Sequence, residues 1–383
     1  MRRRPLGMVL LAALLLTGCG ATNGDAEPTE ASPPSVESTE PGAGHRASDG
    51  GEWQAGLDAD VAAAVADGAV PGFAMAHVAP DRTVTVAVGG QRSHADATPL
   101  GLGAPFHLGS DTKAMTAVLL GTFVEDGSLD LDASLGELFP EAALVEPTAS
   151  VTLRDVLGHR AGLSDDLLDL EALWAATDAS AARADAVLAA LGAAGEPGTF
   201  AYANVGYMLA GTVAERLGSA PWEQLITERV FRPLGMDCGF GAPTGPGAPL
   251  GHTADGTVIG DDDPIVDNPA ALGPAGTVHC TMAGWAAFGT AVLDGLQGKD
   301  SSVLDADTAA DLFEGDQDYV AGWSRLEEEG QSIWAHDGSN TLWYARAILL
   351  VERDEVLLLA ANTGEQSAVD AMDRLTQAFL TEG

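Results

Sequence analysis

The chain has 383 residues, 46% of them hydrophobic, and a formal net charge of −38 at pH 7. A surface this acidic repels nucleic acid and anionic lipid, which excludes both as partners held by charge. Only two of the 18 basic residues are lysines, Lys113 and Lys299, so the surroundings of each lysine are informative.

Residues 1–19 have the three-part pattern of an export signal. Arginines at positions 2–4 precede an apolar run at 8–16 that is too short to span a bilayer. The ending Leu16-Thr17-Gly18-Cys19 resembles the lipobox of bacterial lipoproteins, in which the cysteine becomes the lipidated first residue of the mature protein. The alternative is an ordinary signal peptide in which Cys19 is incidental. We expect export across the cytoplasmic membrane and anchoring at the cell surface or in the periplasm by the lipid alone.

Residues 20–50 predict a disordered tether. They are rich in Pro, Ser, Thr, Glu, Gly and Asp and have almost no large apolar side chains, so they cannot bury a core. Residues 51–383 are then long enough for one large folded unit.

Strand patterns occur near both ends of the folded part. The β-type runs 73–79 and 82–88, separated by Pro80-Asp81, predict a hairpin, and apolar residues at helical spacing predict a helix over 110–126. The further predicted helices are 152–157, 168–191, 205–217, 221–230, 282–296 and 366–380. The further predicted strands are 319–326, 331–335, 343–351 and 355–361. This order indicates an α/β (α+β) fold: a mixed sheet built from both termini and flanked by helices, with an inserted, mostly helical region at roughly 127–298.

Lys113 follows Ser110 by three residues within the predicted helix at 110–126. Residues i and i+3 lie on one helix face, so the serine hydroxyl and the lysine amine are neighbours. A desolvated lysine can lose its proton, and a neutral amine can then activate the serine as a nucleophile. A Ser-x-x-Lys match arises readily by chance, so further segments are needed.

Tyr202-Ala203-Asn204 is the second candidate segment. A tyrosine beside a cation can relay a proton, and an asparagine amide can position a substrate carbonyl or orient the lysine. The alternative is a buried tyrosine before a helix with the asparagine at its cap.

His336-Asp337-Gly338-Ser339 is the third candidate segment. A glycine there would let a substrate lie close to the backbone, and a following backbone N–H could complete an oxyanion hole. The alternative is a hairpin turn built on Asp337-Gly338.

In this chain order the three segments resemble the signature of the serine β-lactamase and penicillin-binding superfamily. The likeness is strongest to the class C β-lactamase and D-Ala-D-Ala carboxypeptidase branch, with its related esterases and D-aminopeptidases. It extends over roughly residues 55–380. The other segments that resemble this family are 106–113 (Phe-His-Leu-Gly-Ser-Asp-Thr-Lys), 129–140, 153–163 and 275–280.

The resemblance implies a β-lactamase/transpeptidase-like fold and an acyl-enzyme mechanism with no metal or organic cofactor. Ser110 would attack a carbonyl, and Lys113 and Tyr202 would share the proton transfers. The implied oxyanion hole consists of the backbone N–H groups of Ser110 and Ser339. The substrate-binding residues that the resemblance implies are Asn204, His336, Gly338 and Ser339.

Two positions depart from the commonest form of this pattern. His336 stands where many relatives have lysine, and a histidine is charged only below about pH 6.5, which makes it a weak partner for a substrate carboxylate. Asp337 replaces a small hydroxyl residue, and we expect its charge to lie near the pocket and to disfavour anionic substrates.

Beyond Cys19 the chain has two cysteines, Cys238 and Cys280. Outside the cytoplasm they could form a disulfide, and two separate buried thiols are the alternative.

The expected function is a lipid-anchored serine hydrolase that acts on an amide, β-lactam or ester bond, of the D-Ala-D-Ala carboxypeptidase or β-lactamase type. A carboxylesterase or D-aminopeptidase on the same fold is an alternative. A non-catalytic, penicillin-recognising sensor lipoprotein is an alternative of another class. The expected partners are a small-molecule or peptidoglycan-type substrate and the membrane through the lipid. The sequence leaves the substrate and the oligomeric state open.

Overall fold

The computed structural model describes residues 50–66, 70–245, 247–260, 263, 266–315, 317–328 and 330–381. The predicted export signal, Cys19 and the tether up to residue 49 lie outside the described residues. Within the described part, no helix combines the length and apolar character needed to cross a bilayer.

Within the described residues, eight strands form one sheet in the order β3-β2-β1-β11-β10-β9-β8-β7. These strands are β1 (Gly72–Val78), β2 (Val84–Ser93), β3 (Asp96–Pro99), β7 (Tyr319–Val320), β8 (Trp323–Glu328), β9 (Gln331–Ser339), β10 (Tyr344–Leu350) and β11 (Glu355–Ala361). A smaller sheet has the order β4-β6-β5 and consists of β4 (Phe106–His107), β5 (Cys238–Phe240) and β6 (Val278–Cys280). The first and last strands of the chain meet at the centre of the large sheet, where Phe73 of β1 lies opposite Ala361 of β11.

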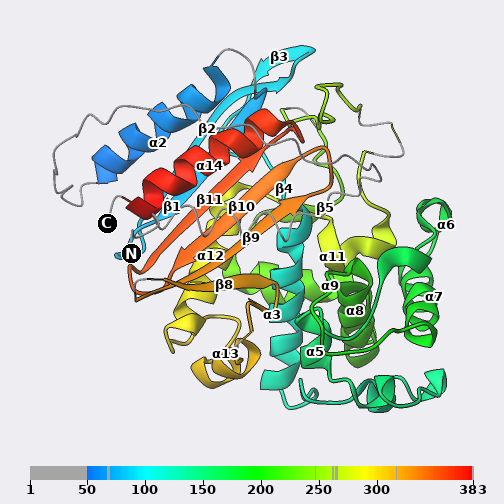
Figure 1. Cartoon of the computed structure of the whole chain (residues 1–383). Helices are drawn as coiled ribbons and strands as arrows, with labels where there is room; N and C mark the ends of the chain where they lie inside the picture. Colours follow the sequence, from blue (N-terminus) through cyan, green and yellow to red (C-terminus); the bar gives the residue numbers. More distant parts are fainter. Residues whose placement is uncertain are drawn as a thin grey trace, which may run out of the picture.

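The helices fill the long connection between the two halves of the sheet and also cover its faces (Figure 1). The α-helices are α2 (Gly50–Val65), α3 (Thr112–Glu125), α4 (Leu135–Leu138), α5 (Leu153–Leu157), α6 (Leu170–Ala175), α7 (Ala179–Gly192), α8 (Asn204–Gly218), α9 (Trp222–Ile226), α10 (Arg232–Leu234), α11 (Gly273–Gly276), α12 (Met282–Leu296), α13 (Ala306–Leu312) and α14 (Gln366–Thr381). The shorter helical turns used below are η2 (Gly109–Asp111), η5 (Asp165–Leu167), η6 (Thr227–Phe231) and η7 (Ala270–Leu272).

The large sheet is covered on both faces. Helices α2 and α14, blue and red in Figure 1, bury one face through a cluster that includes Leu57, Phe73 and Met372. On the opposite face α12 packs against β1 and β11, and the turn η2 contacts β9 and β10. Because both faces are buried, every residue of β1 and β11 is buried, and both strands are apolar apart from His77 and Glu355.

The prediction of a sheet built from both termini and flanked by helices is confirmed, with one difference. Every strand pairing described for the large sheet is antiparallel, so the sheet is antiparallel and not mixed. Short turns join β1 to β2, β8 to β9, β9 to β10 and β10 to β11. A short turn can only join antiparallel neighbours.

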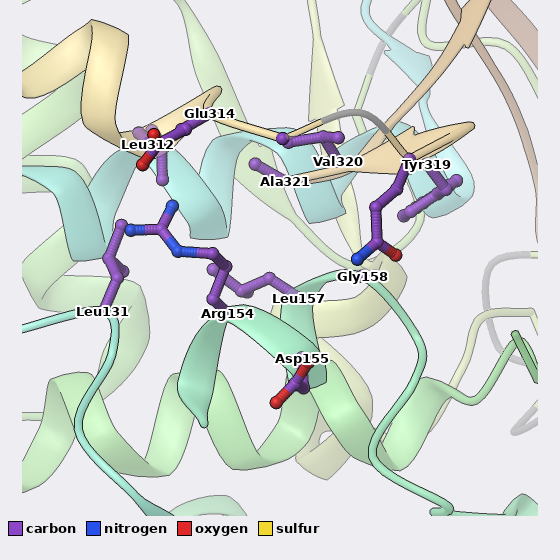
Figure 2. Close-up of a pocket in the computed structure, with 12 residues that line it drawn as sticks. Leu131, Arg154, Asp155, Leu157, Gly158, Leu312, Glu314, Tyr319, Val320 and Ala321 are labelled. Atoms are coloured by element: carbon purple, nitrogen blue, oxygen red, sulfur yellow. The ribbon is translucent and has the colours of Figure 1, made fainter. Parts of the chain in front are cut away.

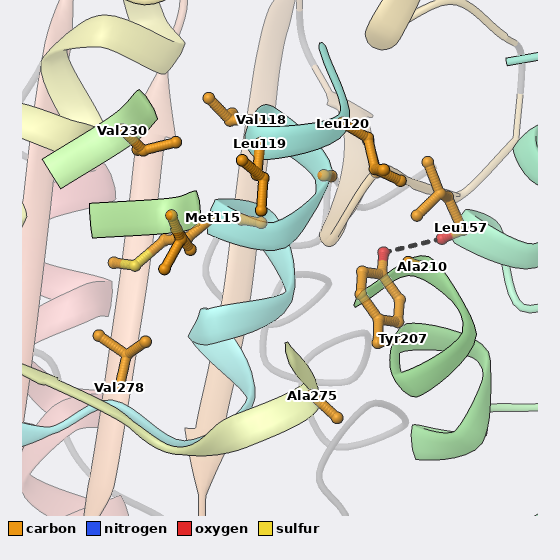
Figure 3. Close-up of a cluster of buried hydrophobic side chains, with 14 of the residues drawn as sticks. Met115, Val118, Leu119, Leu120, Leu157, Tyr207, Ala210, Val230, Ala275 and Val278 are labelled. Atoms are coloured by element: carbon orange, nitrogen blue, oxygen red, sulfur yellow. Dashed lines mark hydrogen bonds between the residues drawn. The ribbon is translucent and has the colours of Figure 1, made fainter. Parts of the chain in front are cut away.

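Helix α3 lies between the sheet and the helical insertion (Figures 1 and 3). Eleven of its 14 residues are buried, from Thr112 to Phe123. A helix that is buried all round has no polar face, so the three buried polar residues in its first two turns matter. These are Thr112, Lys113 and Thr116. The Thr116 hydroxyl donates a hydrogen bond to the Pro274 carbonyl (2.7 Å). Figure 3 shows α3 facing Tyr207 of α8, whose hydroxyl donates to the Leu157 carbonyl (2.9 Å).

Several predicted elements differ in their limits. The helix predicted over 168–191 is two helices, because Asp178 caps the start of α7 by accepting from the Ala181 N–H. The helix predicted over 221–230 continues through the π-type turn η6 into α10, which has Pro233 in its first turn. Strand β9 runs on to Ser339, past the predicted end at residue 335, so the chain does not form the alternative hairpin turn at Asp337-Gly338.

The small sheet lies inside the region predicted as helix and loop. Its strands β5 and β6 place Cys238 opposite Cys280, and the two cysteines are joined by a disulfide. The third strand, β4, leads directly into the turn that holds Ser110. The disulfide therefore lies in the small sheet that carries the segment before the nucleophile candidate.

Candidate active site

Ser110 lies in the turn η2 between β4 and α3. Gly109 before it has a φ of +51°, a left-handed conformation that glycine adopts most easily. Its N–H donates to Nδ1 of His107 (3.0 Å). This turn brings the Ser110 hydroxyl oxygen to 3.0 Å from Nζ of Lys113 on the first turn of α3. The predicted pairing of the serine and the lysine is therefore present.

Lys113 is fully buried, and its amine has three neighbours that can accept or donate hydrogen bonds. Besides Ser110, Nζ donates to Oδ1 of Asn204 (2.8 Å) and to the Ala275 carbonyl (2.7 Å). Nζ also lies 4.8 Å from the centre of the Tyr202 ring. The structure thus brings together Ser110, Lys113, Tyr202 and Asn204, which are far apart in the sequence.

Asn204 is oriented by Asp165, a residue that the sequence analysis does not identify. One carboxylate oxygen of Asp165 accepts from both the backbone N–H and the side-chain amide of Asn204, each at 2.9 Å. Its other oxygen accepts from the Val205 N–H (2.9 Å). Asp165 therefore caps the N-terminus of α8 from a distant segment. It also fixes the Asn204 amide so that its oxygen faces Lys113.

Tyr202 packs against His159, which precedes the predicted motif residues Ala161-Gly162-Leu163. The two ring centres are 4.3 Å apart, and Nδ1 of His159 accepts from the Ala203 N–H (3.2 Å). Burial, together with the nearby Lys113 and His336, lowers the pKa of His159 well below its usual value. A neutral imidazole therefore supports the Tyr202–Asn204 segment.

The His336 ring is fully buried beneath the nucleophile turn and does not line an open surface. Its Nδ1 lies 3.3 Å from Oδ1 of Asp111, and its Nε2 is hydrogen bonded to the Tyr319 hydroxyl (3.1 Å). Burial and the Lys113 cation lower the pKa of His336 to about 3. Burial and the Asp337 carboxylate raise the pKa of Asp111 well above its usual value. A single proton shared by this pair would leave it with no net charge.

Gly338 explains why β9 continues past the predicted turn. A side chain there would overlap the Leu108 carbonyl oxygen, and it would lie 2.9 Å from the Asp111 nitrogen. Likewise, a Cβ on Gly109 would overlap the backbone nitrogen of Ser339. The two glycines let the end of β9 lie directly against the nucleophile turn. The backbone nitrogens of Ser110 and Ser339 are thereby brought to the same edge of the site.

The Asp337 side chain does not point into the site as expected, because successive residues of a strand face opposite sides of a sheet. Asp337 points to the face covered by α14, where Arg346 donates to both of its oxygens (2.7 and 2.8 Å). The Tyr344 hydroxyl also donates to it (2.6 Å). Asp337 is only 3% exposed and is compensated by the guanidinium.

A cavity of about 70 Å³ lies elsewhere, between α5 and the segment from α13 to β7 (Figure 2). Arg154, Gly158, Glu314 and Tyr319 are among its lining residues, and Ser110 and Lys113 are not. The Arg154 guanidinium beside it is already bound by Asp132 and Asp311. The candidate catalytic residues Ser110 and Lys113 therefore do not lie in this cavity.

Comparison with known proteins decides the family. The family model described as Beta-lactamase matches residues 57–381 of this chain. The chain belongs to the β-lactamase family. The family and fold predicted from the sequence are confirmed, and so is its membership in a class of serine hydrolases.

Relatives of this β-lactamase-family chain include penicillin-binding protein 4 of Amycolatopsis lactamdurans. It is 28% identical over 255 residues, which are 61% of this chain and 66% of the relative. The chain thus spans slightly less than two thirds of that protein. Among solved structures, SurE with D-Leu has a TM-score of 0.70 at 23% identity, covering 87% of this chain and 76% of SurE. The D-amino acid amidase of Ochrobactrum anthropi SV3, complexed with L-phenylalanine amide, has a TM-score of 0.69 at 21% identity, covering 86% and 98%. These two similarities show the shared fold.

In this family member, several site residues that were not predicted from the sequence contact residues that were. Asp165 holds Asn204, Asp111 contacts His336, and Tyr319 binds His336 from β7. Asp111 lies inside the Ser-x-x-Lys motif, so its place directly after the candidate nucleophile was a usable signal. Asp165 and Tyr319 reach the site from distant segments, and no local pattern marks them.

Proposed function

We propose that this chain is an exported, lipid-anchored serine hydrolase that opens an amide, β-lactam or ester bond through an acyl-enzyme on Ser110. The observation that carries the proposal is the 3.0 Å contact between the Ser110 hydroxyl and Nζ of a fully buried Lys113. A lysine whose amine is removed from water and directed at a serine is the arrangement needed for nucleophile activation.

The contacts of Lys113 suit the role of a base. A neutral amine has two N–H groups and one lone pair. The Asn204 amide oxygen and the Ala275 carbonyl accept hydrogen bonds from Nζ, which lies 3.0 Å from the Ser110 hydroxyl oxygen. In the neutral amine these two acceptors can take its two N–H groups, which would leave the lone pair for the Ser110 hydroxyl. Lys113 would take the serine proton as the hydroxyl oxygen attacks the substrate carbonyl. The carbonyl oxygen, now negative, would accept hydrogen bonds from the N–H groups of Ser110 and Ser339. Tyr202 would relay this proton from Lys113 to the leaving group as the substrate bond breaks. Water would then hydrolyse the acyl ester on Ser110, and its proton would return to the Ser110 oxygen.

The environment of His336 favours the amide and ester alternatives over the carboxypeptidase and β-lactamase type. D-Ala-D-Ala peptides and penicillins carry a carboxylate that needs a positive partner. His336 is buried, its pKa is lowered to about 3, and it lies beside Asp111, so near neutral pH it offers no such partner. Two of the structural relatives, a D-amino acid amidase and SurE with D-Leu, are described with amino-acid compounds. We therefore place D-amino-acid amides and esters first among candidate substrates.

Intact-mass spectrometry tests the function. Wild-type protein and Ser110→Ala are incubated separately with benzylpenicillin and with p-nitrophenyl acetate. We expect a transient acetyl adduct on the wild type and none on the variant. Persistent labelling by penicillin with no release would instead support a penicillin-recognising sensor. Adducts of equal extent on both proteins would refute Ser110 as the nucleophile.

Steady-state kinetics test the substrate class. The kcat/KM for D-phenylalanine amide is expected to exceed that for an acyl-D-Ala-D-Ala peptide and for benzylpenicillin. A higher kcat/KM for either carboxylate substrate would show that the site has a carboxylate partner, and the D-amino-acid amide assignment would then fail.

The proposal of a lipid anchor is based on the sequence of residues 16–19 and on the polar tether that follows them. In a producing cell, Cys19→Ala is expected to release the protein from membranes or to block its processing. A wild-type protein that is fully soluble with an unmodified N-terminus would rule the anchor out.

A further inference from the structure

Asp267 occupies a position that the mechanism above does not use. Its side chain is only 9% exposed, and its Oδ1 lies 2.9 Å from Nε2 of His107. His107 is fully buried, and its Nδ1 accepts the N–H of Gly109 (3.0 Å). Because Nδ1 accepts, the ring proton is on Nε2, the nitrogen beside the Asp267 carboxylate. The two atoms make a close polar contact that lacks the alignment of a hydrogen bond. This contact connects Asp267 to the residue immediately before Ser110.

The same carboxylate oxygen reaches the other side of the site. Oδ1 of Asp267 accepts a hydrogen bond from the side-chain amide of Asn340 (3.0 Å). Asn340 directly follows Ser339, and its own amide oxygen accepts from the N–H groups of Leu342 and Trp343 (both 3.2 Å). Asp267 therefore also connects to the turn that ends β9.

The segment that carries Asp267 is itself anchored. The Asp267 carbonyl accepts from the Trp174 indole N–H (3.0 Å), and the neighbouring Asn268 amide donates to the Gly276 carbonyl (2.8 Å). One oxygen atom thus joins the turn before Ser110 to the turn after Ser339, and the backbone around it is fixed.

We propose that Asp267, acting through His107 and Asn340, sets the spacing of the Ser110 and Ser339 N–H groups that receive the substrate oxyanion. Asp267, His107 and Asn340 are positioning residues, since none of them needs to touch the substrate. This inference rests on the proposed function, because it assumes that Ser110 is the nucleophile. An oxyanion hole acts mainly on the transition state, and errors of about 1 Å in such a site can cost on the order of 100-fold in rate.

The test compares Asp267→Ala with wild type in acylation by p-nitrophenyl acetate and in binding of phenylboronic acid. The boronic acid forms a tetrahedral adduct with a serine hydroxyl and so reports on the oxyanion hole. We expect kcat to fall roughly 100-fold with KM changed by less than about threefold, and the Kd for phenylboronic acid to rise by a similar factor to the loss in kcat. Asp267→Asn keeps an acceptor oxygen and is expected to retain most of the activity.

His107 variants separate the two contacts of that ring. His107→Asn keeps an acceptor near the Nδ1 position for Gly109 but loses the contact with Asp267. His107→Gln keeps a donor near the Nε2 position but loses the acceptor. Both are expected to lower kcat and to weaken phenylboronic acid binding, because each removes one of the two contacts that connect Asp267 to Gly109 through His107.

The matched control is Glu355→Ala. It removes a carboxylate from another buried histidine, His77, whose Nε2 lies 3.2 Å from Oε1 of Glu355 on the face covered by α2 and α14. We expect it to lower the melting temperature while leaving kcat and phenylboronic acid binding unchanged.

Three outcomes would overturn the inference: an Asp267→Ala enzyme within threefold of wild-type kcat, equal losses in Asp267→Ala and Glu355→Ala, or a loss confined to KM. If Asp267→Ala does not fold, His107→Asn is judged by the same criteria in its place, and Asp267→Asn remains the variant expected to retain most of the activity. Failure of the proposed function is recognised separately, because Ser110→Ala would then still be acylated.

Discussion

At the scale of single residues, the orientation of Asn204 depends on Asp165. The Asp165 carboxylate accepts the Asn204 amide, which leaves the amide oxygen for Lys113. Without this acceptor the Asn204 side chain could rotate, and Lys113 would lose a fixed partner.

Replacing Asp165 with alanine is therefore expected to lower kcat/KM by about 10- to 100-fold, the range seen when a catalytic group is misplaced. It should also lower stability by about 1 kcal/mol, since a helix cap is removed. Asp178→Ala is the control, because Asp178 caps α7 by accepting from Ala181 and does not contact the site. Equal kcat/KM in both variants would contradict a positioning role for Asp165.

At the scale of elements, the small sheet holds the approach to the nucleophile. Strand β6 pairs with both β4 and β5, and the Cys238–Cys280 disulfide joins β6 to β5. The residues it links are 42 positions apart.

Replacing both cysteines with serine is expected to lower the free energy of unfolding by roughly 3–4 kcal/mol, from the chain-entropy relation for such a loop. Below the transition, kcat should change little, because neither cysteine contacts Ser110. Denaturant unfolding with and without dithiothreitol measures this. A wild-type protein whose unfolding does not respond to dithiothreitol would contradict it.

Elements differ in how far the sequence predicts them. Strands β1 and β11 were predictable because each is a short apolar run. Helices α3, α12 and α14 were predictable because their apolar residues recur at helical spacing. Helix α2 was not predicted, and neither was the sheet β4-β6-β5. Its strands have only two or three residues, and the pairing of β4 with β6 joins segments more than 100 positions apart. The break before α7 depends on a single cap, Asp178, which a periodicity argument passes over.

The same limit applies to the site. Ser110, Lys113, Tyr202 and Asn204 belong to motifs with fixed local spacing and could be named in advance. The positions of their side chains relative to distant partners could not. His336 illustrates the difference, because its motif was visible, but its contacts with Asp111 and Tyr319 depend on how β9 packs against η2 and β7.

At the scale of the whole molecule, stability should depend on pH through His159. Burial lowers the pKa of His159 well below 6.5 in the folded chain, whereas the unfolded chain has a value of about 6.5. Below that pH the unfolded chain binds a proton that the folded chain does not, so the free energy of unfolding falls as the pH falls. The lowered pKa of His336 acts in the same direction as that of His159, whereas the raised pKa of Asp111 acts in the opposite direction, so the contributions of these two residues oppose each other.

His159→Asn isolates this contribution. Asparagine tolerates the positive φ of this position (+56°) and keeps an acceptor for the Ala203 N–H. Between pH 6.5 and 4.5, the wild type is expected to lose up to about 1.4 kcal/mol per pH unit more than the variant. Urea unfolding at a series of pH values measures the difference. Parallel curves for the two proteins would show that His159 is not the group responsible.

The central claim is that the buried amine of Lys113 removes the proton of Ser110. A guanidinium keeps the positive charge but cannot accept a proton near neutral pH. The most direct measurement is kcat/KM of Lys113→Arg for the best ester or amide substrate, beside Lys299→Arg as the matched control at the chain's other lysine. We predict a loss on the order of 1,000-fold or more for Lys113→Arg and no change for Lys299→Arg. A Lys113→Arg enzyme within tenfold of wild type would contradict the account, because Lys113 could not then be the base.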